Sequence, residues 1–118
     1  MTPEQRKKTM IMHGAIKAKI DKNEPAHVLD TWCQPCGTYG CIGGDTFIAI
    51  YPEYIGDYDA IGYGANRLSL NFEHHFGFSS RFEVDGNTCD VFGASDDGTL
   101  QQRLDYVESQ LALNEHGS

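Results

Sequence analysis

The sequence contains no lysine after Lys22, although lysine is frequent before it. Six of the nine basic residues lie in the first 22 positions, where only Glu4 and Asp21 oppose them, whereas positions 23–118 hold 15 acidic residues and three arginines. Because contacts with nucleic-acid phosphates need Lys and Arg side chains, this absence argues against direct nucleic-acid binding by the main body. Two interpretations are left, ordinary acidic solubility and an acidic surface that contacts a basic partner.

Long apolar runs are also missing. No stretch approaches the roughly 20 apolar residues that a membrane-spanning helix needs, and charges interrupt the apolar residues of the first 20 positions, unlike those of a secretory signal. We therefore expect a cytoplasmic protein without a membrane partner. Stable disulfides are rare in that reducing compartment, which favours free thiols or metal binding for the four cysteines. The length of 118 residues, without a linker or low-complexity tract, predicts a single domain over residues 1–118.

Both ends of the chain are predicted to be helical. The pattern Thr2-Pro3-Glu4-Gln5 is typical of a helix start with a capping box, and apolar residues at helical spacing continue the helix to Asp21. A second helix is predicted to begin at a cap formed by Asp96 or Asp97 and to end near Asn114. Its apolar stripe is formed by Leu100, Leu104, Val107 and Leu111.

Between these helices the sequence predicts strands, from apolar runs and from alternation of apolar and polar residues. The candidate strands are His27–Trp32, Thr46–Tyr51, Arg67–Phe72, Phe78–Val84 and Thr88–Phe92. Asp85-Gly86-Asn87 is a hairpin signal between the last two. The order of elements predicts an α+β fold, an antiparallel sheet of about four to five strands flanked by the N-terminal and C-terminal helices on one face. We expect the apolar residues of the first helix to pack on that sheet and its lysines to project outward.

Three of the four cysteines lie between positions 33 and 41. The run Trp32-Cys33-Gln34-Pro35-Cys36 resembles the active-site motif of the thioredoxin family, and a candidate strand leads into it as in that family. The resemblance covers five residues and implies a thiol-disulfide oxidoreductase in which Cys33 attacks as a low-pKa thiolate and Cys36 resolves. The glycine-rich residues 37–44 stand where the family has a long helix, so we expect Cys33 to react as an ordinary thiol.

The same cysteines are also typical of a zinc site. The C-x2-C spacing of Cys33 and Cys36 is that of a zinc knuckle, although a second C-x2-C or H-x3-H pair is missing. The cysteines therefore have two interpretations, ligands of one structural zinc ion or buried thiols. The candidate ligands are Cys33, Cys36, Cys41 and Cys89, with His27, His74 or His75 as substitutes for Cys89.

Residues 51–63 (YPEYIGDYDAIGY) carry no positive charge and interleave carboxylates with tyrosines. Tyrosine offers rigid amphipathic contact area, and carboxylates pair with Arg or Lys of a partner, so this pattern is typical of a protein interface. The alternative is a polar loop whose tyrosines cover the edge of the sheet. The candidate partner-binding residues are Glu53, Tyr54, Asp57, Tyr58 and Asp59.

These features predict a small acidic binding protein, an inhibitor or decoy that presents this face to the basic site of a nucleic-acid-processing enzyme. Small acidic proteins of phages and plasmids that block host defence nucleases act in this way as nucleic-acid mimics, and the comparison is one of physical type only. The lack of a coherent set of catalytic residues favours a binding protein over an enzyme. A zinc-stabilised interaction module and a thiol-disulfide oxidoreductase are the two alternatives.

Overall fold

A computed structural model describes residues 1–23, 42–93 and 98–117, with side chains up to residue 113. Within these ranges the protein combines helices with one two-stranded antiparallel sheet, which is consistent with the predicted α+β class. No helix in them has the length and apolar character needed to cross a membrane. The elements are α1 (Pro3–Asp21), α2 (Ile42–Ile50), the 3-10 helix η1 (Pro52–Tyr54), α3 (Tyr58–Leu70), α4 (Phe72–Phe76), β1 (Arg81–Val84), β2 (Asn87–Asp90) and α5 (Leu100–Gly117).

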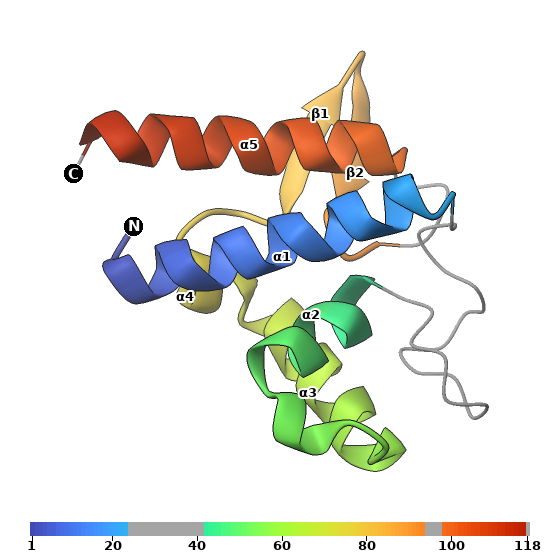
Figure 1. Cartoon of the computed structure of the whole chain (residues 1–118). Coiled ribbons are helices and arrows are strands. Elements are labelled where there is room, and N and C mark those ends of the chain that lie inside the picture. Colours follow the sequence, from blue (N-terminus) through green and yellow to red (C-terminus); the bar gives the residue numbers. More distant parts are fainter. Residues whose placement is uncertain (24–41, 94–97, 118) are drawn as a thin grey trace.

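The two terminal helices lie side by side and run antiparallel (Figure 1). The predicted capping box of α1 is confirmed, because the Gln5 amide donates to Thr2 Oγ1 at 3.1 Å and the Thr2 amide donates to Gln5 Oε1 at 2.8 Å. α5 begins with the same pair of bonds between Thr99 and Gln102, at 3.0 and 2.9 Å. The caps predicted at positions 96–97 lie outside the described residues.

Two of the predicted strands are helical instead. The run Thr46–Tyr51 lies in α2 and at its end, and Arg67–Phe72 covers the last turn of α3 and the start of α4. Leu70, which would share one apolar face with Leu68 and Phe72 in a strand, is 75% exposed, whereas Leu68 and Phe72 are buried. The buried side chains of α3 recur at helical spacing: Ile61, Ala65 and Leu68. The period of a short apolar run does not show whether the run forms a buried strand or a buried helix. Here the tertiary packing selects the helix.

The predicted hairpin is confirmed in a shorter form. The antiparallel ladder of β1 and β2 closes with Val84 opposite Asn87. Asp85 and Gly86 form the turn with φ angles of 53° and 82°, which is the backbone that an Asp-Gly turn favours. The sheet therefore has two strands in the described ranges, rather than the four to five that the sequence predicts, and the candidate strand His27–Trp32 lies outside those ranges.

Among the elements that the structure describes, α1 packs mainly against α5, α2 and α4 rather than on a sheet, where the sequence predicts it to pack. Met12 and Ile16 are buried as expected, but Lys19 is buried as well, so the lysines of α1 do not all project outward. The Lys19 ammonium lies 2.9 Å from the Asp45 carboxylate of α2. The hydrophobic core comprises Met12, Ile16, Ile42, Phe47, Ile61, Leu68, Phe72, Phe76, Phe78, Val91, Phe92, Leu104 and Val107.

A buried arginine ties the end of β2 to the start of α5. Arg103 is fully buried, and its guanidinium donates to the carbonyl oxygens of Val91 at 3.1 Å and Gly93 at 2.7 Å. Two further bonds, of 3.2 and 3.0 Å, reach the carbonyl oxygen of Gly98. Buried carbonyl groups need hydrogen-bond donors, and one side chain provides them for three residues of this connection.

Candidate functional site

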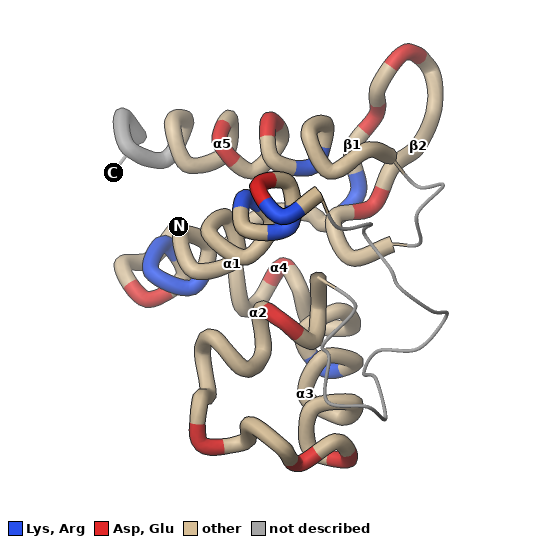
Figure 2. The backbone as a smooth tube through the Cα atoms, turned by 45° about the vertical axis from the view of Figure 1, so that its right-hand side comes forward, with Lys and Arg blue, Asp and Glu red and all other residues tan. Residues whose placement is uncertain are grey.

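The predicted partner-binding residues gather at one end of the molecule. We term residues 52–59, which form η1 and the beginning of α3, the acidic tip. Figure 2 shows that its acidic positions lie at the end of the α2–α3 unit that faces away from α1 and α5, with no Lys or Arg among them. All five predicted residues lie in this segment because they are close in the sequence: Glu53, Tyr54, Asp57, Tyr58 and Asp59.

The carboxylates of the acidic tip have different environments. Asp57 is the N-cap of α3, and its Oδ1 accepts the amide of Ala60 at 3.1 Å. Glu53 and Asp59 are exposed and form no ion pair with any other described residue. Asp57 therefore has a structural role, whereas Glu53 and Asp59 are available to a partner.

A packed group of rings supports the tip from the side of α2. The ring of Phe47 stacks on Tyr54 with 5.6 Å between centroids, and Tyr51 contacts both rings at 5.1 and 6.4 Å. A Cβ atom at Gly64 would overlap the Phe47 ring, so α3 approaches α2 closely only because this position is glycine. Tyr54 keeps 39% of its surface exposed, and it is therefore a supported ring with one accessible side.

An open hollow of about 650 Å³ lies beside these rings. Its aromatic wall is formed by Phe47, Tyr51, Tyr54 and Tyr63. Tyr63 projects from α3 and is 75% exposed. We term this feature the aromatic hollow, and its volume lies in the range of small-molecule sites in proteins.

Polar side chains form the other part of the lining. Glu53 belongs to the acidic tip, whereas Arg67, Asn71 and His75 come from α3, from the position after it and from α4. The Arg67 guanidinium makes no ion pair or hydrogen bond with another residue that the structure describes. The hollow therefore has an acidic rim near the tip and a donor-rich end toward α4.

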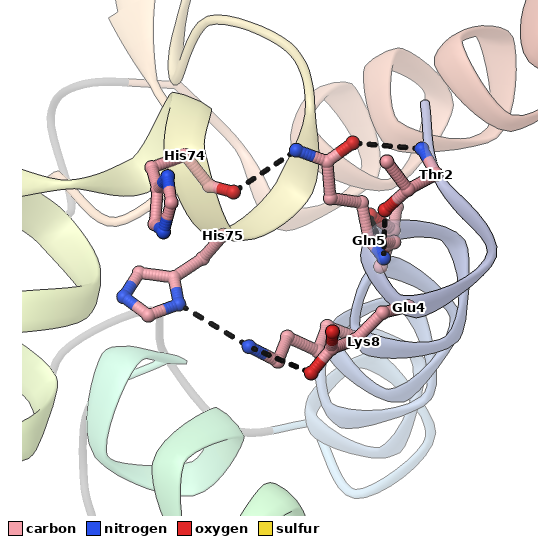
Figure 3. A network of polar contacts seen from close by, with 7 residues as sticks. Thr2, Glu4, Gln5, Lys8, His74 and His75 are labelled. Atoms are coloured by element: carbon pink, nitrogen blue, oxygen red, sulfur yellow. Dashed lines mark hydrogen bonds and ion pairs between the residues drawn. The ribbon is translucent and has the colours of Figure 1, made fainter.

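His75 is positioned by contacts between α4 and α1. The Gln5 side chain donates to the carbonyl oxygen of His74 at 3.0 Å, and Lys8 Nζ lies 3.4 Å from His75 Nδ1 (Figure 3). An ammonium group can only donate, so Nδ1 accepts this bond and the neutral ring carries its proton on Nε2. Burial lowers the pKa of His75, and the charges of Lys8 and His74 lower it further, which favours that neutral form.

The described residues bring no metal ligands together. Cys33, Cys36 and Cys41 lie outside the described ranges, and Cys89 is a buried free thiol on β2. Among the residues that the structure describes, no group of three or more His, Cys, Asp or Glu could hold a metal ion. The zinc site and the thioredoxin-like chemistry of Cys33 and Cys36 therefore stay predictions from the sequence.

Sequence reasoning missed the aromatic hollow. Tyr63 and Arg67 lie on one face of α3 because they are four positions apart in a helix. The sequence analysis assigned Arg67–Phe72 to a strand and therefore did not place these two residues on a common face. A helical assignment would have revealed it. No pattern in the sequence joins His75 to these residues, because the contact of α4 with α3 is tertiary.

Comparisons of the chain with protein-family models, curated proteins and solved structures found no match.

Proposed function

We propose that this protein is a small acidic binding protein that contacts a basic partner protein through the acidic tip. The observation that carries the proposal is the presence of two exposed carboxylates, Glu53 and Asp59, in the same short segment as the supported ring of Tyr54. Rigid tyrosines are frequent anchors at protein interfaces because little side-chain entropy is lost when they are buried. Carboxylates beside such an anchor select partners that present Arg or Lys.

A nucleic-acid-processing enzyme suits this chemistry as the partner, because its substrate channel is basic and shaped for an anionic chain. In such a channel the protein acts as an inhibitor or decoy, a nucleic-acid mimic of the anti-defence type. The net charge of −8 supports long-range attraction to such a channel. Association should therefore be fast at low ionic strength and slower once salt shortens the Debye length.

The test reverses the two available charges of the tip with Glu53→Lys combined with Asp59→Lys. Asp57 is kept because its carboxylate caps α3. The matched control, Asp21→Lys with Glu83→Lys, changes the net charge equally at exposed positions of α1 and β1. Wild type serves as bait in lysate of the source cells, and the captured protein is purified for association kinetics with all three proteins.

We expect the tip variant to associate roughly tenfold more slowly than the control at low salt, because steering depends on where the charges lie. The difference between the two association rates should decrease as salt is added. Circular dichroism first confirms that both variants are folded. Equal association rates for the tip variant and the control would show that the acidic tip is only a solvated surface.

A further inference from the structure

The two ends of the aromatic hollow differ in charge. Glu53 and Tyr54 lie on the side of the acidic tip, and Arg67, Asn71 and His75 line the other end. A basic partner surface suits the first end and is repelled by the second. The donor-rich end therefore needs a different explanation from the acidic tip.

Arg67 carries the positive charge of that end. Its side chain is exposed, and within the described ranges no carboxylate or carbonyl group engages its guanidinium. A guanidinium presents two parallel N–H groups that match the two oxygens of a carboxylate or phosphate. An arginine in a hollow without a protein partner is thus available to an anionic ligand.

His75 adds a second donor. Its Nδ1 faces Lys8, while its other ring nitrogen points away from α1 (Figure 3). Because Nδ1 accepts from the ammonium of Lys8, Nε2 carries the proton and can donate to an anion in the hollow. Lys8 stands behind the ring and adds positive charge to this end, although Glu4 lies 3.9 Å from its ammonium and offsets part of that charge.

The remaining wall is aromatic and partly uncovered. Tyr63 is 75% exposed and Tyr54 is 39% exposed, although both border the hollow. Planar rings stack well on tyrosine side chains, and a ligand that covers these two rings removes apolar surface from water. A volume of about 650 Å³ accommodates a molecule of one or two fused rings with a side group.

We propose that the aromatic hollow binds a small planar aromatic molecule that carries one acidic group. The ring lies against Tyr54 and Tyr63, and the acidic group, a carboxylate or a phosphate, accepts hydrogen bonds from Arg67 and His75. This site goes beyond the contact proposed for the acidic tip, because apart from Tyr54, which the two share, it uses residues of α3 and α4 that a basic partner does not need.

The test uses two pairs of probes with the full chain, followed by calorimetry and by NMR shift mapping. Indole-3-acetate is compared with indole-3-acetamide, and adenosine 5′-monophosphate with adenosine. We expect at least one acid to bind about tenfold more tightly than its neutral analogue, with shifts at residues 47–75, because a hydrogen bond to a charged group is worth about that factor. The pair that shows the preference identifies carboxylate or phosphate.

Two substitutions separate the charge from the aromatic wall. Arg67→Gln should reduce the preference for the acid severalfold, with the His75 donor left in place, while the control Arg81→Gln on exposed β1 should keep it in full. Tyr63→Ala should weaken the acid and its neutral analogue alike, and the control Leu70→Ala, equally exposed on α3 but outside the hollow, should weaken neither. All four positions are exposed, so folding should be retained.

The proposal is overturned if neither acid binds at millimolar concentration, or if acids and neutral analogues bind equally. It is also overturned if Arg67→Gln behaves like Arg81→Gln, or if the shifts map outside the hollow. Asp59→Lys lies outside the lining and should leave probe binding unchanged while impairing the partner contact. Failure of one proposal is therefore distinguishable from failure of the other.

Discussion

The terminal helices with the hairpin and the α2–η1–α3 unit differ in how they use their polar side chains. In the first region several polar side chains bond from one element to another. Arg103 serves three backbone carbonyls, His13 Nε2 lies 3.0 Å from a Glu108 carboxylate oxygen, and Arg6 donates to the carbonyl of Leu111 at 3.1 Å. In the second region the main contacts are between rings, and Glu53, Asp59 and Arg67 find no ionic partner among the described residues. Polar groups left available at an exposed surface are those that can bind a ligand or a partner.

Exposed apolar side chains occur in both regions, with more of them in the second. Ile55, Tyr63 and Leu70 of the α2–η1–α3 unit are 63%, 75% and 75% exposed, and Met10 of α1 and Leu113 of α5 are 56% and 66% exposed. Single exposed apolar residues are ordinary, but in the second region they accompany unpaired charges of both signs and a hollow. The comparison assigns the scaffold to the first region and the proposed recognition surface to the second.

The largest expected effect tests the scaffold. Arg103→Ala should lower the free energy of unfolding by about 3 kcal/mol or more, because three buried or partly buried carbonyl groups lose their donor. Arg67→Ala, the matched change in the α2–η1–α3 unit, should shift it by no more than about 0.5 kcal/mol. Urea denaturation followed by circular dichroism measures both. Similar losses at the two arginines would end the distinction between scaffold and recognition surface.

A pair of glycine substitutions compares the close contact of α2 with α3 with an open position on α1. Gly64→Ala should cost about 1–2 kcal/mol, because the new Cβ atom forces the Phe47 ring to move. Gly14→Ala on α1 meets no atom within 4 Å and should stabilise the protein by about 0.5–1 kcal/mol through helix propensity. Thermal unfolding should therefore shift in opposite directions. A gain at both positions would mean that the contact of α2 with α3 is loosely packed.

The smallest expected effect concerns His75, at the boundary between the regions. Folding lowers the pKa of His75 below its ordinary value of 6.5 through burial and the charges of Lys8 and His74. As the pH falls, the unfolded chain therefore binds a proton at His75 at a higher pH than the folded protein does. The contribution of His75 to the free energy of unfolding is thus fully retained above pH 6.5 and is lost as the pH falls below that value. Melting temperatures between pH 8 and pH 5 should show a decline that is shallower in His75→Gln. An identical decline in both proteins would assign it to other groups.

Helix starts and the hairpin were within reach of the sequence because short-range bonds define them. The capping box of Thr2 and Gln5 was predicted. Thr99 and Gln102 have the same capping-box spacing, but the sequence analysis placed the cap at Asp96 or Asp97 instead. The turn at Asp85 and Gly86 needs positive φ angles, which that dipeptide tolerates. Such features depend on neighbours in the chain and need no knowledge of the tertiary structure.

The helical middle of the chain was beyond this reasoning. The run Thr46–Tyr51 is rich in residues that favour strands, and burial in a helical environment overrides that preference. The acidic tip was predicted because its residues are close in the sequence. The aromatic hollow was not, since Phe47, Arg67 and His75 meet only after three helices have packed.

The distances along the chain across these contacts bear on how the protein folds. Arg6 and Leu111 meet across a separation of 105 residues, and His13 and Glu108 across 95. Phe47 and Gly64 are in contact across only 17 positions. The entropic free-energy cost of closing the loop between them is about 1.5 kcal/mol smaller than that of bringing α1 and α5 together. We therefore expect α2 and α3 to associate early, with α1 and α5 closing over the chain afterwards. The unit that carries the proposed recognition surface would then form before its scaffold, and the terminal helices, which are bonded across the longest separations, would be the last to assemble.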